Sequence, residues 1–319
     1  MYGLKQDWAL EPRPRLFVLD DYESNVPRWC PGCGDTAVLT ALQRVARDEQ
    51  IPPEKLVAVS GIGCSSRLPH YMKTYGFHGI HGRAFPVACG VRARRPDLHI
   101  FVVTGDGDCC AIGTAHWIHA TRYNMNMTVM LFDNNTYGLT KMQTSPTTEV
   151  GHFSNTHPRG ALLNPIAPLS VMLGVPNVSF VAQTVDWNPA HVLSTIKAAH
   201  HHQGFSFIRI LQRCPHYMSD VFDPIQRDPS RLLLLQHENG ISVPDAIANT
   251  YPNKREHDPT DLAAARAIAG GGQADAFPIG LLYQNKDAQR YDLMTSEGLA
   301  MSAKDRVAAA QTAIDRFLV

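Results

Sequence analysis

Three features that would narrow the class of this protein at once are missing from the chain. No apolar run in its 319 residues approaches the roughly 20 residues that a membrane span requires. Positive and negative side chains balance at 29 each, so the chain lacks the excess positive charge of a nucleic-acid binder. The first residues have neither the apolar segment nor the cleavage site of a signal peptide. We therefore expect a cytoplasmic protein that binds neither membranes nor nucleic acids.

What the chain does contain is an ordinary globular composition, with 44% hydrophobic and 18% charged residues. Its length suits one large domain with an appendage. Residues 1–28 are rich in Pro, Arg and Asp without periodicity, and we interpret them as an N-terminal arm. Residues 29–225 form the predicted main domain. Residues 226–319 are predicted to be an extension that packs on the core or on a partner subunit.

Helical and strand patterns alternate along the main domain. Helical spacing of apolar residues predicts helices at 35–49, 83–94, 112–122 and 189–202. Apolar, β-rich runs predict strands at 56–59, 99–104, 127–132 and 205–211. Strands that are apolar throughout and alternate with helices indicate an α/β fold, a doubly wound, mostly parallel sheet covered on both faces. A last amphipathic helix is predicted near 304–318.

The chemically unusual segments all follow predicted strands, at the edge of the sheet where ligands of such folds bind. One is Gly-Asp-Gly at 105–107, and Asn134 follows Asp108 by 26 positions at the end of the next strand. A carboxylate, an amide oxygen and a main-chain carbonyl suit Mg²⁺ when diphosphate oxygens complete its octahedron. The alternative interpretation is a surface turn at the glycines and a helix cap at the asparagines.

The seven cysteines are an odd number in an enzyme-sized chain, which argues against a disulfide framework. Cys30 and Cys33 form a C-x-x-C pair, while Cys64 and Cys214 each follow a predicted strand. Four such thiolates suit either an iron–sulfur cluster or a zinc ion. A redox pair with two unrelated core thiols is the remaining alternative. The other three cysteines are predicted to be buried thiols: Cys89, Cys109 and Cys110.

The order of the motifs carries a family resemblance. GDG followed at this spacing by NN resembles the signature of thiamine diphosphate enzymes. The series WCPGCG, GIGCSSR, HGRAFPVACG, GDGD, NNTYGLTKMQTSPT and a late cysteine resembles the β subunits of 2-oxoacid:ferredoxin oxidoreductases. The resemblance covers residues 25–220, and PIGLLYQ at 278–284 is similar to the C-terminal sequence of that family. This resemblance implies a domain of the diphosphate-binding type.

The resemblance also implies a set of ligands. The Mg²⁺ ligands would be Asp106, Asn134 and Thr136. One 4Fe–4S cluster would be held by Cys30, Cys33, Cys64 and Cys214. Thiamine diphosphate would contact nine residues: Ile62, Gly63, Cys64, Ser65, His81, Gly107, Asp108, Gly138 and Leu139.

The activity implied by the resemblance is the coenzyme A-dependent oxidative decarboxylation of a 2-oxoacid to acyl-CoA and CO₂, with electrons leaving through the cluster to ferredoxin. Its direction in the cell stays open. We favour 2-oxoglutarate over pyruvate as the substrate. Lys141 and Arg83 are candidates to bind the carboxylates of the oxoacid. His81 is a candidate to position the diphosphate or to carry protons, and a structural histidine is the alternative.

In this family the glutamate that activates the cofactor belongs to the pyrimidine-binding domain of an α subunit. The nearest acidic candidate here, Glu149, is predicted to lie in an exposed loop and so to be a poor activator. We therefore expect half of an active site, completed by the α subunit in an α2β2 assembly. Three other interpretations remain open: a pyruvate-specific homologue, a non-redox thiamine diphosphate decarboxylase subunit, and a zinc-stabilised interaction subunit.

Overall fold

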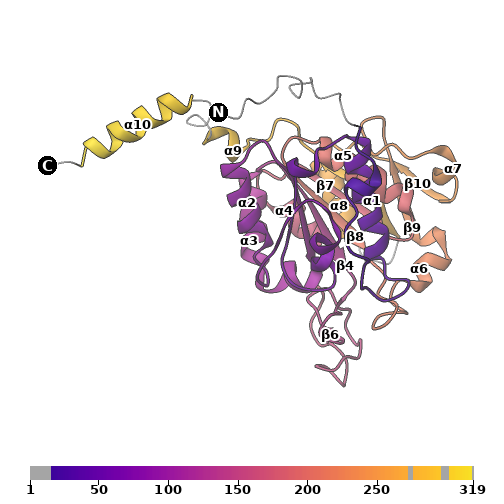
Figure 1. Cartoon of the computed structure of the whole chain (residues 1–319). Coiled ribbons are helices and arrows are strands. Elements are labelled where there is room, and N and C mark those ends of the chain that lie inside the picture. The colour runs from indigo at the N-terminus through magenta and orange to yellow at the C-terminus, as the bar shows by residue number, and fades with distance from the viewer. Residues whose placement is uncertain (1–15, 272–275, 296–301, 318–319) are drawn as a thin grey trace.

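A single sheet of nine strands forms the centre of the molecule, as the computed structural model shows for residues 16–271, 276–295 and 302–317 (Figure 1). The strand order is β10-β9-β11-β7-β8-β4-β3-β1-β2. Its strands are β1 (Leu56–Ser60), β2 (Tyr75–His78), β3 (His99–Gly105), β4 (Met127–Asp133), β7 (Phe180–Val185), β8 (Phe205–Leu211), β9 (Leu232–Gln236), β10 (Asn253–Glu256) and β11 (Phe277–Gln284). All neighbouring strands are parallel except β7 and β11. The predicted doubly wound, mostly parallel α/β fold is confirmed.

Helices cover both faces of this sheet. The helices are α1 (Asp35–Asp48), α2 (Ala84–Arg94), α3 (Thr114–Tyr123), α4 (Pro168–Gly174), α5 (Pro189–His201), α6 (Asp223–Arg227), α7 (Asp245–Ala248), α8 (Leu262–Gly270), α9 (Tyr291–Met294) and α10 (Ala303–Asp315). One apolar core lies between the sheet and α2, α3, α4 and α8, and a second lies under α1 and α5. None of the helices in the described ranges is long and apolar enough to cross a membrane.

Alternation along each strand divides its side chains between the two cores. Val57 and Val59 of β1 enter the core under α2 and α3, whereas Leu56 and Ala58 enter the core under α1 and α5. All five residues of β1 and all seven of β4 are buried. Strands that are buried on both faces must be apolar throughout, which is why these runs predicted a parallel sheet.

The C-terminal third contributes more to the sheet than its sequence indicated. β9, β10 and β11 continue the sheet beyond β7, so these strands are part of the sheet and not an extension packed against it. β10 gave no apolar signal because it is a polar edge strand with all four residues exposed, whereas the apolar runs of β9 and β11 were present in the sequence but were not assigned to the sheet. The described side chains of α10 are also exposed, and Figure 1 shows this helix apart from the sheet. Packing of α10 on the core is therefore wrong, and packing on a partner stays a prediction.

Asn124 closes α3 and holds three segments together. Its φ of 49° lies in the left-handed region, which asparagine tolerates better than most residues. Its Oδ1 accepts hydrogen bonds from the main-chain N–H of Phe205 at 2.7 Å and from Ser179 Oγ at 2.6 Å. Its Nδ2 donates to the carbonyl oxygens of Ala288 and Gln289 at 3.3 and 3.2 Å. This buried side chain therefore joins β8 and the start of β7 to the chain after β11.

We expect Asn124→Ala to destabilise the fold by about 3 kcal/mol, because a buried donor or acceptor left unpaired costs about 1–3 kcal/mol each. Asn124→Gly restores the backbone freedom but not the hydrogen bonds, and should still cost about 2 kcal/mol. Urea unfolding measures both, with Asn126→Ala, which loses one exposed hydrogen bond to Gln203, as the control. Full stability of Asn124→Gly would show that only the backbone conformation matters.

Candidate functional site

The predicted cofactor and magnesium residues meet around one small cavity at the carboxyl ends of β1, β3 and β4. The cavity has a volume of about 80 Å³. All nine predicted cofactor contacts and all three predicted magnesium ligands line it, together with Gly105, Phe132, Tyr137 and Thr140. The carboxyl ends of parallel neighbours lie at the same edge of a sheet, so loops far apart in sequence become walls of one site.

Asp106 is the buried carboxylate of this cavity. It follows β3 directly and is 2% exposed. Its Oδ2 accepts hydrogen bonds from Ser145 Oγ at 2.6 Å and from Thr147 Oγ1 at 2.7 Å. Burial and the nearby negative charge of Asp133 raise the pKa of Asp106 above its ordinary value. The groups that hold this carboxylate, two hydroxyl groups and the main chain of Gly107, are all neutral, so a cation in the cavity would favour its charged form.

Asp133 carries the second charge beside the cavity, and it is neutralised inside the protein. Arg209 of β8 donates to its Oδ2 from Nε at 2.7 Å and lies 2.6 Å from it through Nη2. Thr147 Oγ1 lies within hydrogen-bond distance of Asp133 Oδ1 as well, at 2.8 Å. Arg209 is therefore paired with Asp133, and the hydrogen bonds to Asp106 described above include no positively charged side chain.

Asn134 presents its amide in a defined orientation. Its Nδ2 donates to Gln212 Oε1 at 2.7 Å, and its Oδ1 accepts the main-chain N–H of Thr136 at 3.2 Å. Thr136 itself begins a two-stranded hairpin of β5 (Thr136–Tyr137) and β6 (Gln143–Thr144). The amide oxygen is therefore directed toward Thr136, which lines the cavity with Asn134.

Asp108 has a different task from Asp106, although both belong to the motif GDGD. Its Oδ1 accepts the main-chain N–H groups of Ile62 at 3.1 Å and Gly82 at 2.6 Å. Its Oδ2 accepts a hydrogen bond from Thr104 Oγ1 at 2.8 Å. A Cβ at Gly61 would lie 2.0 Å from this carboxylate, so only glycine fits there. Asp108 borders the cavity, but its oxygens tie the loops after β1 and β2 to β3.

The three predicted substrate residues are placed differently. His81 lines the cavity, and its Nδ1 lies 2.8 Å from Asp108 Oδ1. Arg83 does not line the cavity, and its Nη1 is directed at the carbonyl oxygens of His81, Gly82 and Ile112 at 3.3–3.4 Å. Lys141 is exposed beyond the cavity wall with a φ of 74°. The structure therefore brings His81 to the site and leaves the roles of Arg83 and Lys141 as predictions.

Cys64 lines the same cavity, and Cys214 lies near it. A Cβ at Gly138 would lie 3.6 Å from Cys64 Sγ and 3.8 Å from Cys214 Sγ, so both thiols lie beside this glycine. Burial raises the pKa of Cys33 above its ordinary value, and Asp35, Cys214 and Cys64 add to the shift. Burial likewise raises the pKa of Cys64 to about 12, with further contributions from Asp35, Cys214 and Cys30. Cys33 therefore lies close to Cys64 and Cys214, and Cys64 lies close to Cys214 and Cys30.

The geometry that a zinc ion requires of these thiols differs from that of a cluster. Within the described ranges, no group of three or more His, Cys, Asp or Glu side chains that could hold one metal ion is found. Zinc requires four ligands at about 2–2.3 Å from one centre, whereas the thiolates of a 4Fe–4S cluster each bind a different iron and stand farther apart. The magnesium set contains one carboxylate and two neutral oxygens, so this finding bears on zinc and not on magnesium.

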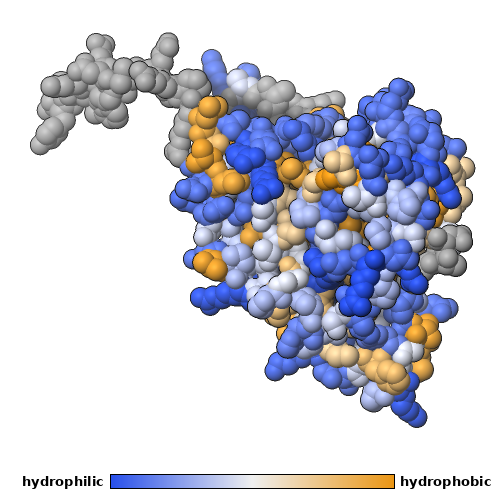
Figure 2. All heavy atoms as spheres, turned by 90° about the vertical axis from the view of Figure 1, so that its right-hand side faces the viewer, coloured by the Kyte–Doolittle hydropathy of each residue, from blue (hydrophilic) through white to orange (hydrophobic). Residues whose placement is uncertain are grey.

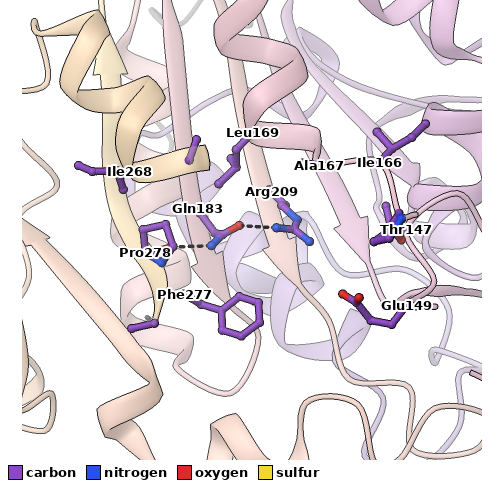
Figure 3. Close-up of a pocket in the computed structure, with 13 residues that line it drawn as sticks. Thr147, Glu149, Ile166, Ala167, Leu169, Gln183, Arg209, Ile268, Phe277 and Pro278 are labelled. Carbon is purple, nitrogen blue, oxygen red and sulfur yellow. Dashed lines mark hydrogen bonds between the residues drawn. The ribbon is translucent and has the colours of Figure 1, made fainter. Parts of the chain in front are cut away.

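A larger cavity of about 370 Å³ lies behind the magnesium residues (Figure 3). Arg209 reaches into it, and its Nη1 donates to Gln183 Oε1 at 3.1 Å. Gln183 Nε2 in turn donates to the carbonyl oxygen of Pro278 at 2.6 Å. Thr147 lines this cavity and also donates to Asp106, so one hydroxyl group lies between the two cavities. None of the predicted site residues lines the larger cavity.

Sequence reasoning missed the residues that support the site from behind. Ser145 and Thr147 hold Asp106, Arg209 neutralises Asp133, and Gln212 orients Asn134. Tyr137 packs against Gly107, where a Cβ would lie 2.5 Å from its ring. A polar arginine inside the apolar run of β8 was the one visible signal, because a buried arginine requires a carboxylate partner.

The fold and this cavity together define a class of protein. Residues 61–210 match the family model described as the thiamine pyrophosphate enzyme, C-terminal TPP binding domain. The chain therefore contains the diphosphate-binding domain of the thiamine diphosphate enzymes.

Comparison with individual proteins narrows the class to a family. The chain is 34% identical over 279 residues to subunit beta of 2-oxoacid:ferredoxin oxidoreductase 2 from Aeropyrum pernix, with 85% of both chains covered. It is 43% identical over 212 residues to the 2-oxoglutarate oxidoreductase subunit KorB of Mycobacterium tuberculosis, covering 66% of this chain and 57% of that relative. The chain belongs to the β subunits of the 2-oxoacid:ferredoxin oxidoreductases.

A solved structure supports the same assignment. The chain is similar to a chain of 2-oxoglutarate:ferredoxin oxidoreductase from Magnetococcus marinus, solved with 2-oxoglutarate, coenzyme A and succinyl-CoA bound. The TM-score is 0.78 at 36% identity, and the match covers 92% of this chain and 96% of that chain. The sheet, including its C-terminal strands, is therefore the architecture of an enzyme of this family.

We expect Arg209→Met to destabilise the protein by about 3–5 kcal/mol, because it leaves the buried charge of Asp133 unpaired. Arg227→Met removes an exposed pair with Asp223 and should cost less than about 1 kcal/mol. Urea unfolding compares the two variants. The double variant Asp133→Asn/Arg209→Met should recover most of the loss, and additive losses in this pair would contradict the assigned interaction.

Proposed function

We propose that this chain is the β subunit of a 2-oxoglutarate:ferredoxin oxidoreductase, which forms succinyl-CoA and CO₂ and passes electrons through a 4Fe–4S cluster to ferredoxin. One observation carries the proposal. A buried carboxylate without a cationic partner and Cys64 line the same small cavity, and Cys30, Cys33 and Cys214 lie close enough to Cys64 to interact with it electrostatically. The substrate follows from the relatives named for 2-oxoglutarate.

The residues of the cavity fit Mg²⁺ and thiamine diphosphate. Asp106, Asn134 and Thr136 would hold the cation, with one negative charge against its two positive charges. Diphosphate oxygens would supply the balance, which matches the donor set that Mg²⁺ prefers. Gly107 leaves room at the wall where a Cβ would collide with the ring of Tyr137, and Gly138 lies beside Cys64 and Cys214. When bound, the thiazolium ring serves as the electron sink for decarboxylation.

The four thiols fit a cluster better than a zinc ion. Burial raises the pKa of Cys33, Cys64 and Cys214, so a cationic centre would be needed to stabilise their thiolates. Cys30, Cys33, Cys64 and Cys214 would hold the cluster. Because the loop of Cys64 also lines the cofactor cavity, electrons would have only a short distance to travel.

The cavity lacks the carboxylate that would activate the cofactor. Its acidic side chains within the described ranges are Asp106 and Asp108, and both have other partners in this arrangement. Glu149 lines the larger cavity behind them. The activating glutamate therefore has to come from an α subunit.

An exposed apolar surface beside the site offers a place for that subunit. Five residues of the segment around β6 are exposed: Leu139, Val150, Phe153, Leu162 and Leu163. This segment forms the lower end of the molecule in Figure 1, and Figure 2 shows apolar surface at the same end. Apolar surface of this kind next to an incomplete site is typical of a subunit interface. We infer an α2β2 assembly from this half-site.

The test is anaerobic purification of the chain with its α subunit, followed by viologen reduction with coenzyme A across a panel of 2-oxoacids. We expect 2-oxoglutarate to exceed pyruvate and the isolated chain to release no CO₂, since general-base assistance is worth about 10²- to 10⁴-fold. Preference for pyruvate would contradict the substrate, and turnover by the isolated chain would contradict the half-site.

Cysteine variants of the same complex separate the electron-transfer role from the decarboxylase role. Cys30→Ser should lose the broad visible absorption and the viologen reduction while it keeps cofactor binding. Cys64→Ser should impair both. Cys89→Ser is the matched control, because this thiol lies near Asp292 and away from the cavity. A colourless parent that still decarboxylates would favour the non-redox decarboxylase instead.

We expect Asp106→Ala to abolish Mg²⁺-dependent binding of thiamine diphosphate, because the cation loses its one anionic protein ligand. Calorimetry on the complex measures this, with Asp97→Ala, a surface variant beside Lys55 and Arg95, as the control. Binding by Asp106→Ala within a factor of about three of the parent would exclude Asp106 as the metal ligand.

A further inference from the structure

Gln212 lies between the two sets of ligands and belongs to neither of them. It follows β8 directly and is 1% exposed. Its main-chain N–H donates to the carbonyl oxygen of Asp133 at 2.9 Å, which fixes its backbone to the end of β4. Its side chain is therefore held where the magnesium loop and the C-x-x-C loop approach each other.

On one side, Gln212 fixes the amide of Asn134. Gln212 Oε1 accepts the hydrogen bond from Asn134 Nδ2 at 2.7 Å. If the Asn134 amide turned over, two oxygen atoms would face each other in a buried place, and the Thr136 N–H would lose its acceptor. The contact therefore keeps Asn134 Oδ1 toward the predicted cation.

On the other side, Gln212 reaches a cysteine sulfur. Its Nε2 lies 3.5 Å from Cys33 Sγ as a hydrogen-bond donor, and it also donates to the carbonyl oxygen of Arg213. Two acceptors for the amino group leave Oε1 for Asn134, so the orientation of this amide is determined as well. Donors to cysteine sulfur are one of the means by which proteins set the potential of a cluster.

We propose that Gln212 is a positioning residue that couples the magnesium site to the cluster. It holds Asn134 Oδ1 toward the cation, and it raises the reduction potential of the cluster through its hydrogen bond to Cys33. This inference rests on the proposed function. It adds one side chain that both cofactor sites share, so a change in that side chain affects both.

Two variants separate the halves of the proposal. Gln212→Met is close to isosteric and removes both the donor and the acceptor. Gln212→Glu keeps an acceptor for Asn134 and removes the donor to Cys33. Gln226→Met is the matched control, because Gln226 is exposed nearby and contacts only Arg213 through its Oε1. All are made in the complex with the α subunit.

Two measurements apply to each variant: calorimetry of Mg²⁺-dependent thiamine diphosphate binding, and a redox titration of the cluster followed by electron paramagnetic resonance. We expect Gln212→Met to weaken Mg²⁺ binding about 10- to 100-fold, the usual loss when a residue behind a metal ligand is removed. We expect the potential to fall in Gln212→Met and in Gln212→Glu. Gln212→Glu should keep cation binding within about threefold of the parent, because Asn134 keeps its acceptor.

The outcomes distinguish this inference from the function on which it rests. A parent complex without a cluster or without Mg²⁺-dependent binding overturns both. A parent with both, and a Gln212→Met variant that matches Gln226→Met in affinity and potential, overturns the inference alone. If Gln212→Met does not fold, Gln212→Glu decides: an unchanged potential, or cation binding lost more than about 10-fold, contradicts the proposal.

Discussion

Asp106 and Asp133 are both buried beside the cofactor cavity, and of these two only Asp133 has a positively charged partner. Arg209 lies against Asp133 with two donors, whereas Asp106 is held by the hydroxyl groups of Ser145 and Thr147. A buried negative charge without a partner is unfavourable, so the site is arranged to favour a bound cation. Much of the surrounding structure follows from this: the hydroxyl pair, the oriented amide of Asn134 and the glycines that leave space for a ligand.

The motif GDGD illustrates how neighbouring residues of one type acquire different chemistry. Asp106 faces the cavity, while Asp108 two positions later turns back and accepts main-chain N–H groups from the loops after β1 and β2. The first carboxylate is available to a cation and the second builds the wall in which that cation would lie. The family resemblance implied a magnesium ligand at Asp106 and a cofactor contact at Asp108, and the hydrogen bonds of Asp108 to the surrounding loops appear only in the tertiary structure.

The predicted cluster ligands and the predicted magnesium ligands are joined by shared neighbours in this fold. Gly138 lies beside Cys64 and Cys214, and the side chain of Gln212 contacts both Asn134 and Cys33. In the proposed enzyme, decarboxylation and electron removal occur on neighbouring groups held by shared residues. The exposed apolar residues around β6 lie beside this unit, which is where a subunit that completes the half-site would have to bind.

The sequence alone determined the fold class and the strand ends that carry the site, because strands buried on both faces must be apolar and because Gly-Asp-Gly, paired asparagines and C-x-x-C have few other uses at this spacing. Strand β10 was not recognisable, since a polar edge strand has no apolar pattern, and the apolar runs of β9 and β11 did not show locally that they continue the same sheet. The pairing of Arg209 with Asp133, the separate task of Asp108, and the position of Gln212 between Asn134 and Cys33 were decided by tertiary structure. Each of these contacts joins side chains from segments that are far apart in the sequence. A local sequence pattern does not indicate which of these side chains come into contact in the interior.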